Sequence, residues 1–425
     1  MLNTSTEKHW ITNFEELASD KFRKDALLIA EAGLDAIDTD KVIADSIKID
    51  DHDLYIKDKV FNLDDFESIK IIGFGKASSR AAHALEGILK DRISEGAVID
   101  KDPYVCDTVI VHRGTHPRPS LENYAATKEI VSLAEKSGEK DLVIVIVSGG
   151  GSALLCWPEV ECTKGQELYD NFLKSGETIK ELNVVRKHLS TIKGGGLAKL
   201  LYPATVVSLI FSDIPGNYYD QVASGPTFKD PTTKEEAKEI IEELNLGNFE
   251  LFETPKEDLY FEKVHNITLV SNAIALDEMA NKAKSLGYEP QILSYENYEN
   301  ARDTLSNLIR ISSPKSVILA GGEIKLKVDR PGGSGGRNSF LALKAINKIK
   351  NAVFVSLASD GTDNGSSAGA IVDENTLEQA NLGSINLEES VAAFDSHNIL
   401  EKINSIIYTG PTGANVSDLI ILLNK

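Results

Sequence analysis

The sequence has little cysteine and no long apolar run, and each shortage argues against a class of protein. Its 425 residues include three cysteines, an odd count without a Cys-x-x-Cys motif: Cys106, Cys156 and Cys162. We therefore expect neither a disulfide scaffold nor a zinc site, but small buried side chains in a reducing compartment. No run of about 18 apolar residues is present, so no membrane span is expected. The polar start, MLNTSTEKHWITNF, is untypical of a signal peptide and favours a cytoplasmic protein.

Positive charge is also scarce. The chain has 45 Lys and Arg against 65 Asp and Glu, a net charge of −20. This balance disfavours nucleic acid or an anionic membrane as the main partner. It leaves a phosphorylated ligand open, because a few cations in a cleft can outweigh a distant acidic surface.

Several catalytic motifs are missing. There is no GxxxxGK[ST] loop, no protein-kinase HRD or DFG set and no Ser-His-Asp order with a GxSxG elbow. Residues Gly73 to Ser78, GFGKAS, break the GxGxxG pattern at its third glycine, so a dinucleotide site has only weak support.

Apolar runs alternate with amphipathic stretches along the chain, which predicts a doubly wound α/β sheet. In the first half, after a helical start at 14–40, we expect strands at 68–74, 108–112, 143–147 and 205–211 and helices at 75–89, 166–174, 177–189 and 194–201. The charged, proline-punctuated residues 228–265 indicate a boundary or an inserted helical segment. Beyond them we expect strands at 267–271, 288–293, 316–320, 324–328 and 353–357 and helices at 274–286, 297–310 and 337–349. The expected domains are residues 1–255 and 256–425.

The stretch from Asp141 to Leu155, DLVIVIVSGGGSALL, carries the strongest single signal. A buried strand leads into three glycines and a helix start, an arrangement that can bind phosphate through free N–H groups. A tight turn without a ligand is the alternative. Other glycines gather at the ends of predicted strands in both halves, where ligands bind in open α/β sheets. They favour one cleft for a large anionic ligand.

Charged residues beside these loops are candidates for phosphate chemistry. Lys76 follows a glycine turn, and Arg337 follows a run of glycines, where its guanidinium could clamp a carboxylate or a phosphoryl group. Asp360 and Asp363 suit a Mg²⁺ site, with an Asx-turn that caps the next helix as the alternative. Asp213 could bind metal or act as a base. Arg186, Lys187, His188 and Lys193 could attract phosphate or balance a helix C-terminus, whereas His112 and His116 are not expected to form a zinc pair.

Eight ordered motifs resemble the glycerate 2-kinase family, also called class II glycerate kinases or MOFRL proteins. They are GFGKAS, VSGGGSALL, RKHLSTIKGGGLA, SDIPGN with SGPT, GGE, GGRN, SDGTD with AGAIVD, and TGPTGANVSDL. The chain departs from the family at Ser339 and Phe340, where GGRN is usually followed by Gln and Glu. Its SDGTD loop also lacks a later aspartate.

The resemblance implies ATP- and Mg²⁺-dependent phosphorylation of D-glycerate at the 2-hydroxyl. It implies two α/β domains, the first Rossmann-like, with the active site in the cleft between them. Lys76 and Arg337 match the family residues regarded as critical, and Ser148, Gly149, Gly150, Gly151 and Ser152 match its phosphate-binding loop.

Our hypothesis assigns the remaining candidates around these residues. We expect Lys193 and Gly195 to contact ATP, Asn338 to bind substrate with Arg337, Asp213 to act in catalysis, and Asp360 and Asp363 to bind Mg²⁺. A homodimer is a candidate assembly. The alternatives are a reductase of hydroxypyruvate or tartronate semialdehyde and a non-catalytic sensor of a phosphorylated ligand.

Overall fold

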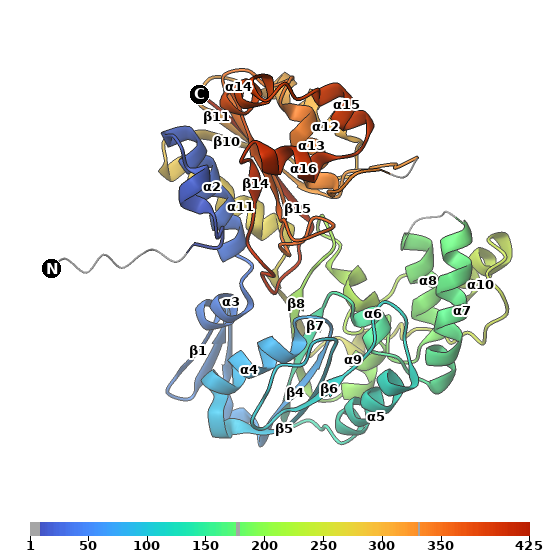
Figure 1. The fold of residues 1–425 in the computed structure, drawn as a ribbon. Helices are drawn as coiled ribbons and strands as arrows, with labels where there is room; N and C mark the ends of the chain where they lie inside the picture. The colour runs from blue at the N-terminus through green and yellow to red at the C-terminus, as the bar shows by residue number, and fades with distance from the viewer. Residues whose placement is uncertain (1–8, 176–178, 330–331) are drawn as a thin grey trace. The chain divides into compact units, whose positions relative to one another are not determined.

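The computed structural model describes residues 9–175, 179–329 and 332–425, and the chain divides into two units (Figure 1). Unit 2 is residues 39–214 and 218–269, and unit 1 is the described residues up to Asp38 together with 215–217 and 270–425. The domains expected at residues 1–255 and 256–425 differ from these two units in two places. The first helices belong to unit 1, and residues 256–269 belong to unit 2, because their strand joins the edge of its sheet.

Unit 2 is built on a six-stranded sheet with the order β6-β5-β4-β7-β8-β9. Its strands are β4 (Ser68–Phe74), β5 (Ile93–Asp100), β6 (Ile110–Arg113), β7 (Asp141–Ser148), β8 (Thr205–Phe211) and β9 (Val264–Val270). The pairs β5–β6, β4–β5, β4–β7 and β7–β8 are parallel. Numbered within the sheet, this is the order 3-2-1-4-5-6 of the Rossmann fold, as expected. The order reverses between β4 and β7, and ligands bind at the carboxyl ends of strands at such a point.

Apolar residues on both faces of the strands explain this sheet. Ile72 and Phe74 pack with Ile130 of α5 and Leu197 of α9, whereas Gly73, on the opposite face, lies against Ser78 of α4. Because successive side chains of a strand point to opposite faces, these contacts show that helices cover both faces of the sheet. The helices of unit 2 are α3 (Thr39–Ser46), α4 (Ser78–Leu89), α5 (Leu121–Glu135), α6 (Gly151–Leu154), α7 (Glu159–Ser175), α8 (Ile179–Leu189), α9 (Gly196–Leu201) and α10 (Lys234–Glu243).

A small antiparallel sheet in unit 2 was not predicted. It has the order β1-β2-β3, with β1 (Ile47–Asp50), β2 (Asp53–Ile56) and β3 (Lys59–Asn62). Its strands are only four residues long, too short for their alternation of apolar and polar residues to identify them from the sequence.

Unit 1 contains a mixed sheet with the order β10-β11-β15-β12-β13-β14. Its strands are β10 (Glu289–Asn297), β11 (Ser316–Gly322), β12 (Ala352–Ala358), β13 (Gly369–Val372), β14 (Ile406–Ile407) and β15 (Asp418–Asn424). The last strand of the chain, β15, lies antiparallel between β11 and β12. The helices are α1 (Phe14–Leu17), α2 (Lys21–Asp35), α11 (Asn272–Ser285), α12 (Ala301–Ile311), α13 (Arg337–Ala345), α14 (Glu374–Leu382), α15 (Leu387–Ala392) and α16 (Ser396–Lys402).

Two local predictions are wrong. Residues 324–328 do not form a strand, and Lys325 makes only an isolated bridge with Asn300. The N-terminal helix expected over 14–40 is interrupted before Lys21, because Asp20 caps the start of α2 by accepting hydrogen bonds from the N–H groups of Phe22 and Arg23. No helix in the described ranges is long and apolar enough to cross a membrane.

The cysteine prediction also needs correction. Cys156 and Cys162 form a disulfide with their Cα atoms 5.5 Å apart, and Cys106 is the free thiol. The pair closes the turn between α6 and α7, a proximity that a spacing of six residues does not reveal. The number of cysteines therefore no longer supports a reducing compartment.

Candidate active site

The carboxyl ends of β4 and β7 lie directly beside each other in unit 2. The N–H of Lys76 donates to the carbonyl of Gly149 at 2.9 Å, and the N–H of Ala77 donates to Ser148 Oγ at 3.1 Å. Gly75 has a φ of +117°, and a Cβ there would lie 2.4 Å from the Ser148 carbonyl oxygen, so only glycine fits. The two glycine loops predicted from the sequence thus form one structural feature at the switch point.

The Gly149–Gly151 loop turns immediately into helix α6. Gly150 has a φ of +82° and precedes the helix. The helix has four residues, so the dipole expected here is that of a single turn, and the loop must act mainly through its N–H groups. Ser152 bonds Ser224 at 3.0 Å between hydroxyl oxygens, and Ser148 is buried with its hydroxyl turned to the backbone of the neighbouring loop.

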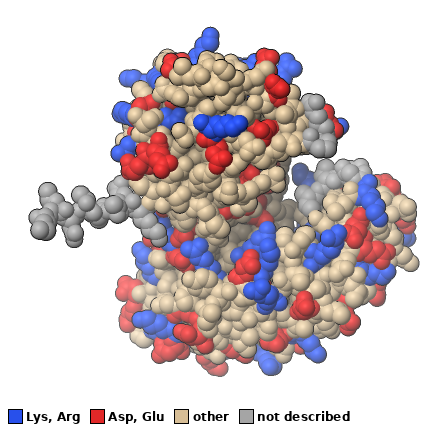
Figure 2. Space-filling model, in the orientation of Figure 1, with Lys and Arg blue, Asp and Glu red and all other residues tan. Residues whose placement is uncertain are grey.

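Basic side chains gather around this loop. Lys76 is exposed, and within the described ranges it has no carboxylate at ion-pair distance. Burial, together with the nearby charges of Lys76, Lys101 and Arg186, lowers the pKa of His116 to about 4, so the imidazole is neutral at physiological pH. Figure 2 shows Lys and Arg interspersed with Asp and Glu over the face in view. The basic cluster is therefore a local feature of an acidic chain.

Asp213, at the end of β8, places a carboxylate against the glycine loop. A Cβ built on Gly149 would collide with the carboxylate of Asp213, so glycine at 149 is required for their approach. Asp213 is partly exposed. Lys76, Gly149 and Asp213 were all selected from the sequence, and the structure brings them together.

Lys193 and Gly195 have structural roles instead of the expected contacts with ATP. Lys193 is buried, forms an ion pair with Glu161 and donates to the carbonyl of Ser152 at 2.8 Å. The N–H of Gly195 donates to the carbonyl of Gly225 at 2.9 Å. These bonds within the protein hold the glycine loop and its neighbours in place. The polar groups of both residues therefore already have partners.

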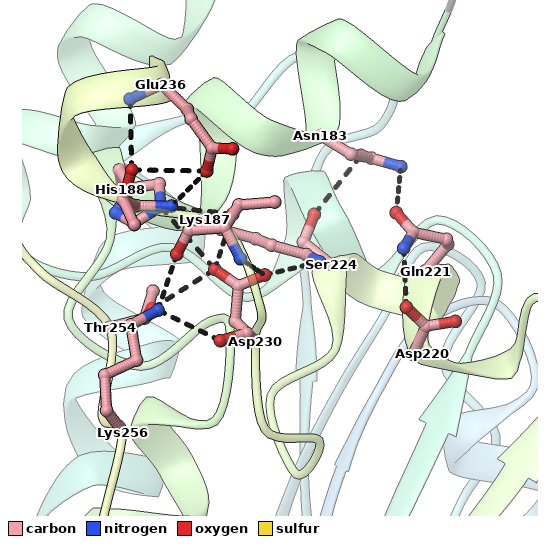
Figure 3. Close-up of polar contacts among 12 residues, drawn as sticks. Asn183, Lys187, His188, Asp220, Gln221, Ser224, Asp230, Glu236, Thr254 and Lys256 are labelled. Atoms are coloured by element: carbon pink, nitrogen blue, oxygen red, sulfur yellow. Dashed lines mark hydrogen bonds and ion pairs between the residues drawn. The ribbon is translucent and has the colours of Figure 1, made fainter. Parts of the chain in front are cut away.

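Helix α8 is anchored to the rest of unit 2 by a buried polar network (Figure 3). Lys187 donates to Asp230 at 3.1 Å, and His188 lies 3.2 Å from the Thr232 hydroxyl. Burial alone would raise the pKa of Asp230, but the Lys187 ammonium and hydrogen bonds from Thr232 lower it below its usual value. The same helix carries Arg186, so this network sets the position of that cation.

Asn183, also on α8, connects the helix to the glycine loop. The Ser224 hydroxyl donates to the Asn183 side-chain oxygen at 3.4 Å, and Ser224 in turn bonds Ser152. Gln221 lies beside Asn183 in the same network (Figure 3). Residues three apart on a helix share a face, so Asn183 and Arg186 lie on the same side of α8.

In unit 1, Arg337 begins helix α13 beside the end of β15. Its Nε atom donates to Asp418 Oδ2 at 2.5 Å, and its NH2 group lies 3.1 Å from Glu323 Oε1. Asn338 donates to Asp418 Oδ1 at 2.7 Å and accepts from the Ser356 hydroxyl at 2.6 Å. Burial raises the pKa of Asp418 to about 6, even though Arg337 and Asn338 favour its ionised form.

The expected metal pair does not fit the geometry of unit 1. Asp363 is buried and caps α13, since its two oxygens accept the N–H groups of Asn338 at 2.9 Å and Ser339 at 2.8 Å. Asp360 accepts the N–H of Thr362 at 2.9 Å, as an Asx-turn does. The alternative from the sequence was an Asx-turn capping the next helix; the turn is present at Asp360, but Asp363 caps the earlier helix α13. We therefore withdraw the Mg²⁺ assignment of Asp363.

Comparison with known proteins agrees with this arrangement. A family model described as a domain of unknown function, DUF4147, matches residues 25–253, and the MOFRL family model matches residues 316–418. A glycerate 2-kinase of Pyrococcus horikoshii is 33% identical, covering 93% of this chain and 96% of its own length. The chain belongs to the MOFRL family of glycerate 2-kinases. The resemblance drawn from the eight motifs is therefore confirmed.

Two further similarities bear on this family. A crystal structure of glycerate kinase from Thermotoga maritima matches with a TM-score of 0.82 and 29% identity, covering 95% of this chain and 99% of that one. A protein of Agrobacterium vitis called putative hydroxypyruvate reductase is 34% identical, covering 83% of this chain and 98% of its own. Both names that the motifs suggested thus occur among similar proteins.

Sequence reasoning missed some residues that the structure places in these clusters. Asp418 lies within the motif TGPTGANVSDL but was not singled out, and Lys101 follows an unpredicted strand. His116 was considered only for zinc, and the buried Asn123 was not considered. The spacing of His116 and the glycine loop in the sequence contains no sign that they meet.

Proposed function

We propose that this protein transfers the γ-phosphoryl group of ATP to the 2-hydroxyl of D-glycerate, giving 2-phosphoglycerate and ADP. The observation that carries the proposal is the meeting of the β4 and β7 loops, where Gly149–Gly151, Lys76 and the neighbouring cations suit a polyphosphate. Membership of the glycerate 2-kinase family supports the acceptor and the position of transfer.

The chain's own groups account for most of what phosphoryl transfer requires. Loop N–H groups and the Lys76 ammonium bind phosphate oxygens and offset their charge. The 2-hydroxyl attacks phosphorus in line as the bond to ADP breaks, and the hydroxyl proton passes to solvent or to a carboxylate. Such a loose transition state depends on positioning and charge more than on a strong base.

Mg²⁺ enters this reaction with ATP, as part of the MgATP substrate, and neutralises phosphate charge. Asp213 is the carboxylate that best fits such an ion, because it lies against Gly149 in the same unit as Lys76. The same carboxylate could equally orient the 2-hydroxyl of glycerate, because carboxylates serve both as Mg²⁺ ligands and as hydrogen-bond acceptors.

Arg337 and Asn338 keep their proposed role in substrate binding. The Arg337 guanidinium is permanently charged and partly exposed, so it can receive the glycerate carboxylate or the moving phosphoryl group. Asp418 and Glu323 orient it. The expected location of the active site in a cleft between two domains stays a prediction.

The direct test is product analysis. The protein is incubated with D-glycerate, ATP and Mg²⁺, and ADP is measured together with 2-phosphoglycerate, which ³¹P NMR separates from the 3-phosphate. Equal amounts of ADP and 2-phosphoglycerate are expected. Formation of 3-phosphoglycerate would overturn the position of transfer, and absence of both products would overturn the kinase function.

A second candidate is a reductase of hydroxypyruvate, because a similar protein carries that name and the sheet has the Rossmann order. Ser78 replaces the third glycine of the dinucleotide pattern, and its hydroxyl is buried with bonds to the carbonyls of Gly75 and Ile99. This counts against a dinucleotide there. Oxidation of NADH by hydroxypyruvate, without kinase activity, would favour the reductase.

Assembly and location belong to the proposal as well. We keep a homodimer as the candidate assembly, which light scattering coupled to gel filtration tests. We also keep the cytoplasm as the expected location, in line with an enzyme that uses ATP.

A further inference from the structure

His116 lies against the glycine loop, although two strands separate β6, which precedes it, from β7 in the sheet. It follows β6, yet a Cβ built on Gly150 would be 3.1 Å from His116 Cδ2 and 3.3 Å from its Nε2. The same point is 3.3 Å from Lys76 Cε. The imidazole and the lysine therefore flank Gly150 closely.

One buried side chain fixes this placement. Asn123, on α5, accepts the N–H of Thr115 at 2.7 Å and donates to the carbonyls of Thr115 at 2.9 Å and Ala153 at 2.8 Å. It is fully buried. Asn123 thus ties the residue before His116 to α6, the helix that begins just after Gly150.

The imidazole has hydrogen-bonding capacity to spare. Among the residues that the structure describes, neither ring nitrogen of His116 has a hydrogen-bond partner, and the side chain is half-buried. The charged groups that act on it are Lys76, Lys101 and Arg186, and all are basic. A neutral imidazole can donate one N–H without adding to that charge.

We propose that His116 binds an anionic oxygen of a substrate through a ring N–H, and that Asn123 is the positioning residue that holds it over Gly150. This rests on the proposed kinase function. The oxygen belongs either to a phosphate of ATP or to the carboxylate of glycerate. Its position beside Lys76 and the glycine loop favours the phosphate.

The first experiment compares His116→Ala and His116→Gln with the wild-type protein. Loss of a hydrogen bond to a charged oxygen should weaken binding about ten- to hundredfold in the alanine variant. Glutamine retains an N–H donor of similar reach and should recover part of the loss. Calorimetry with MgADP and a non-hydrolysable ATP analogue measures binding without turnover, and steady-state kinetics give KM for each substrate.

The pattern of change identifies the oxygen. Weaker nucleotide binding with an unchanged KM for glycerate assigns a phosphate, and the converse assigns the carboxylate. His112→Gln is the matched control, since His112 pairs with Glu129 at 2.9 Å and should bind and react as the wild type does. If His116→Ala leaves both substrates unaffected while the wild type makes 2-phosphoglycerate, the inference is wrong and the kinase function stands.

A double-mutant cycle tests Asn123. If Asn123 acts through His116, Asn123→Ala should change the same KM, and adding His116→Ala should cost little more. A merely structural role predicts lower thermal stability without that shared effect on KM, which would overturn the positioning role. Should Asn123→Ala fail to fold, Asn123→Asp, which keeps the acceptor for Thr115, is used in the same cycle.

Discussion

At the scale of single residues, the sequence identified which charged side chains lie near the loops, but not which protein groups those side chains contact. Lys76 and Asp213 were chosen because they follow predicted strands, and they lie beside the same loop. Lys193 and Asp363 were chosen on equal grounds, but Glu161 and the start of α13 already occupy their polar groups. A motif shows that a charged side chain is present, whereas only the folded chain shows whether a partner has neutralised it.

Loss of Lys76 or Arg337 should abolish most turnover. We expect Lys76→Ala and Arg337→Ala to fold and to lower kcat/KM for glycerate phosphorylation by about 10²-fold or more, because each removes a charge that offsets phosphate or carboxylate. Lys140→Ala, at the amino end of β7, is the control and should be fully active. Near wild-type kinetics in either variant would remove that residue from the mechanism.

The carboxyl of Asp418 should make stability depend on pH. Its pKa is raised from 3.8 to about 6 in the folded state, so folding favours the protonated form. Its contribution is favourable below about pH 4 and is lost as pH rises through 6, a change of about 3 kcal/mol. Relative to wild type, Asp418→Asn should therefore gain stability between pH 4 and 6.5 in urea unfolding. Glu378→Gln, at an exposed site in the same unit, should show no such trend.

At the scale of elements, several long apolar strands were predicted well, but β5, α5, β15 and the short strands β1 to β3 were not predicted. Strands β4 and β8 have the predicted bounds, because segments rich in Ile, Val and Leu are typical of parallel strands buried on both faces. The strands β1 to β3 are only four residues each, too short for alternation to identify them. The position of β15 between β11 and β12 is a long-range pairing, which no local pattern encodes.

The buried anchor of α8 should be costly to break. Asp230→Ala leaves the Lys187 ammonium buried without its carboxylate and should destabilise the protein by about 3–5 kcal/mol. Replacing both, as in Lys187→Met with Asp230→Leu, should cost less, because no charge then remains unpaired. Chemical unfolding of the three proteins measures this, and equal losses in the single and double variants would contradict it.

At the scale of the whole molecule, the acidic chain concentrates basic side chains at one edge of one sheet. A polyphosphate should therefore stabilise the folded protein far more than an uncharged ligand of similar size. The division into two units with separate sheets was expected from the sequence, but their boundaries were not, because the chain leaves unit 1 after its first helices and returns to it later.

MgADP should raise the free energy of unfolding by mass action. At about 100 times its dissociation constant, the gain is about 2.7 kcal/mol if it binds only the folded state. NADH at the same concentration should give no comparable gain. Stabilisation by NADH alone would favour the reductase over the kinase.

The sequence by itself determined the α/β class, the glycine-rich strand ends and the family, because these depend on local periodicity and on residues close together in the chain. Tertiary structure decided which loops meet, which charges are already paired, that Cys156 and Cys162 join, and that His116 lies over Gly150. Those outcomes depend on strand order and on packing between segments far apart in the chain. The same residue types can therefore bind a ligand or hold the fold, according to what the fold brings beside them.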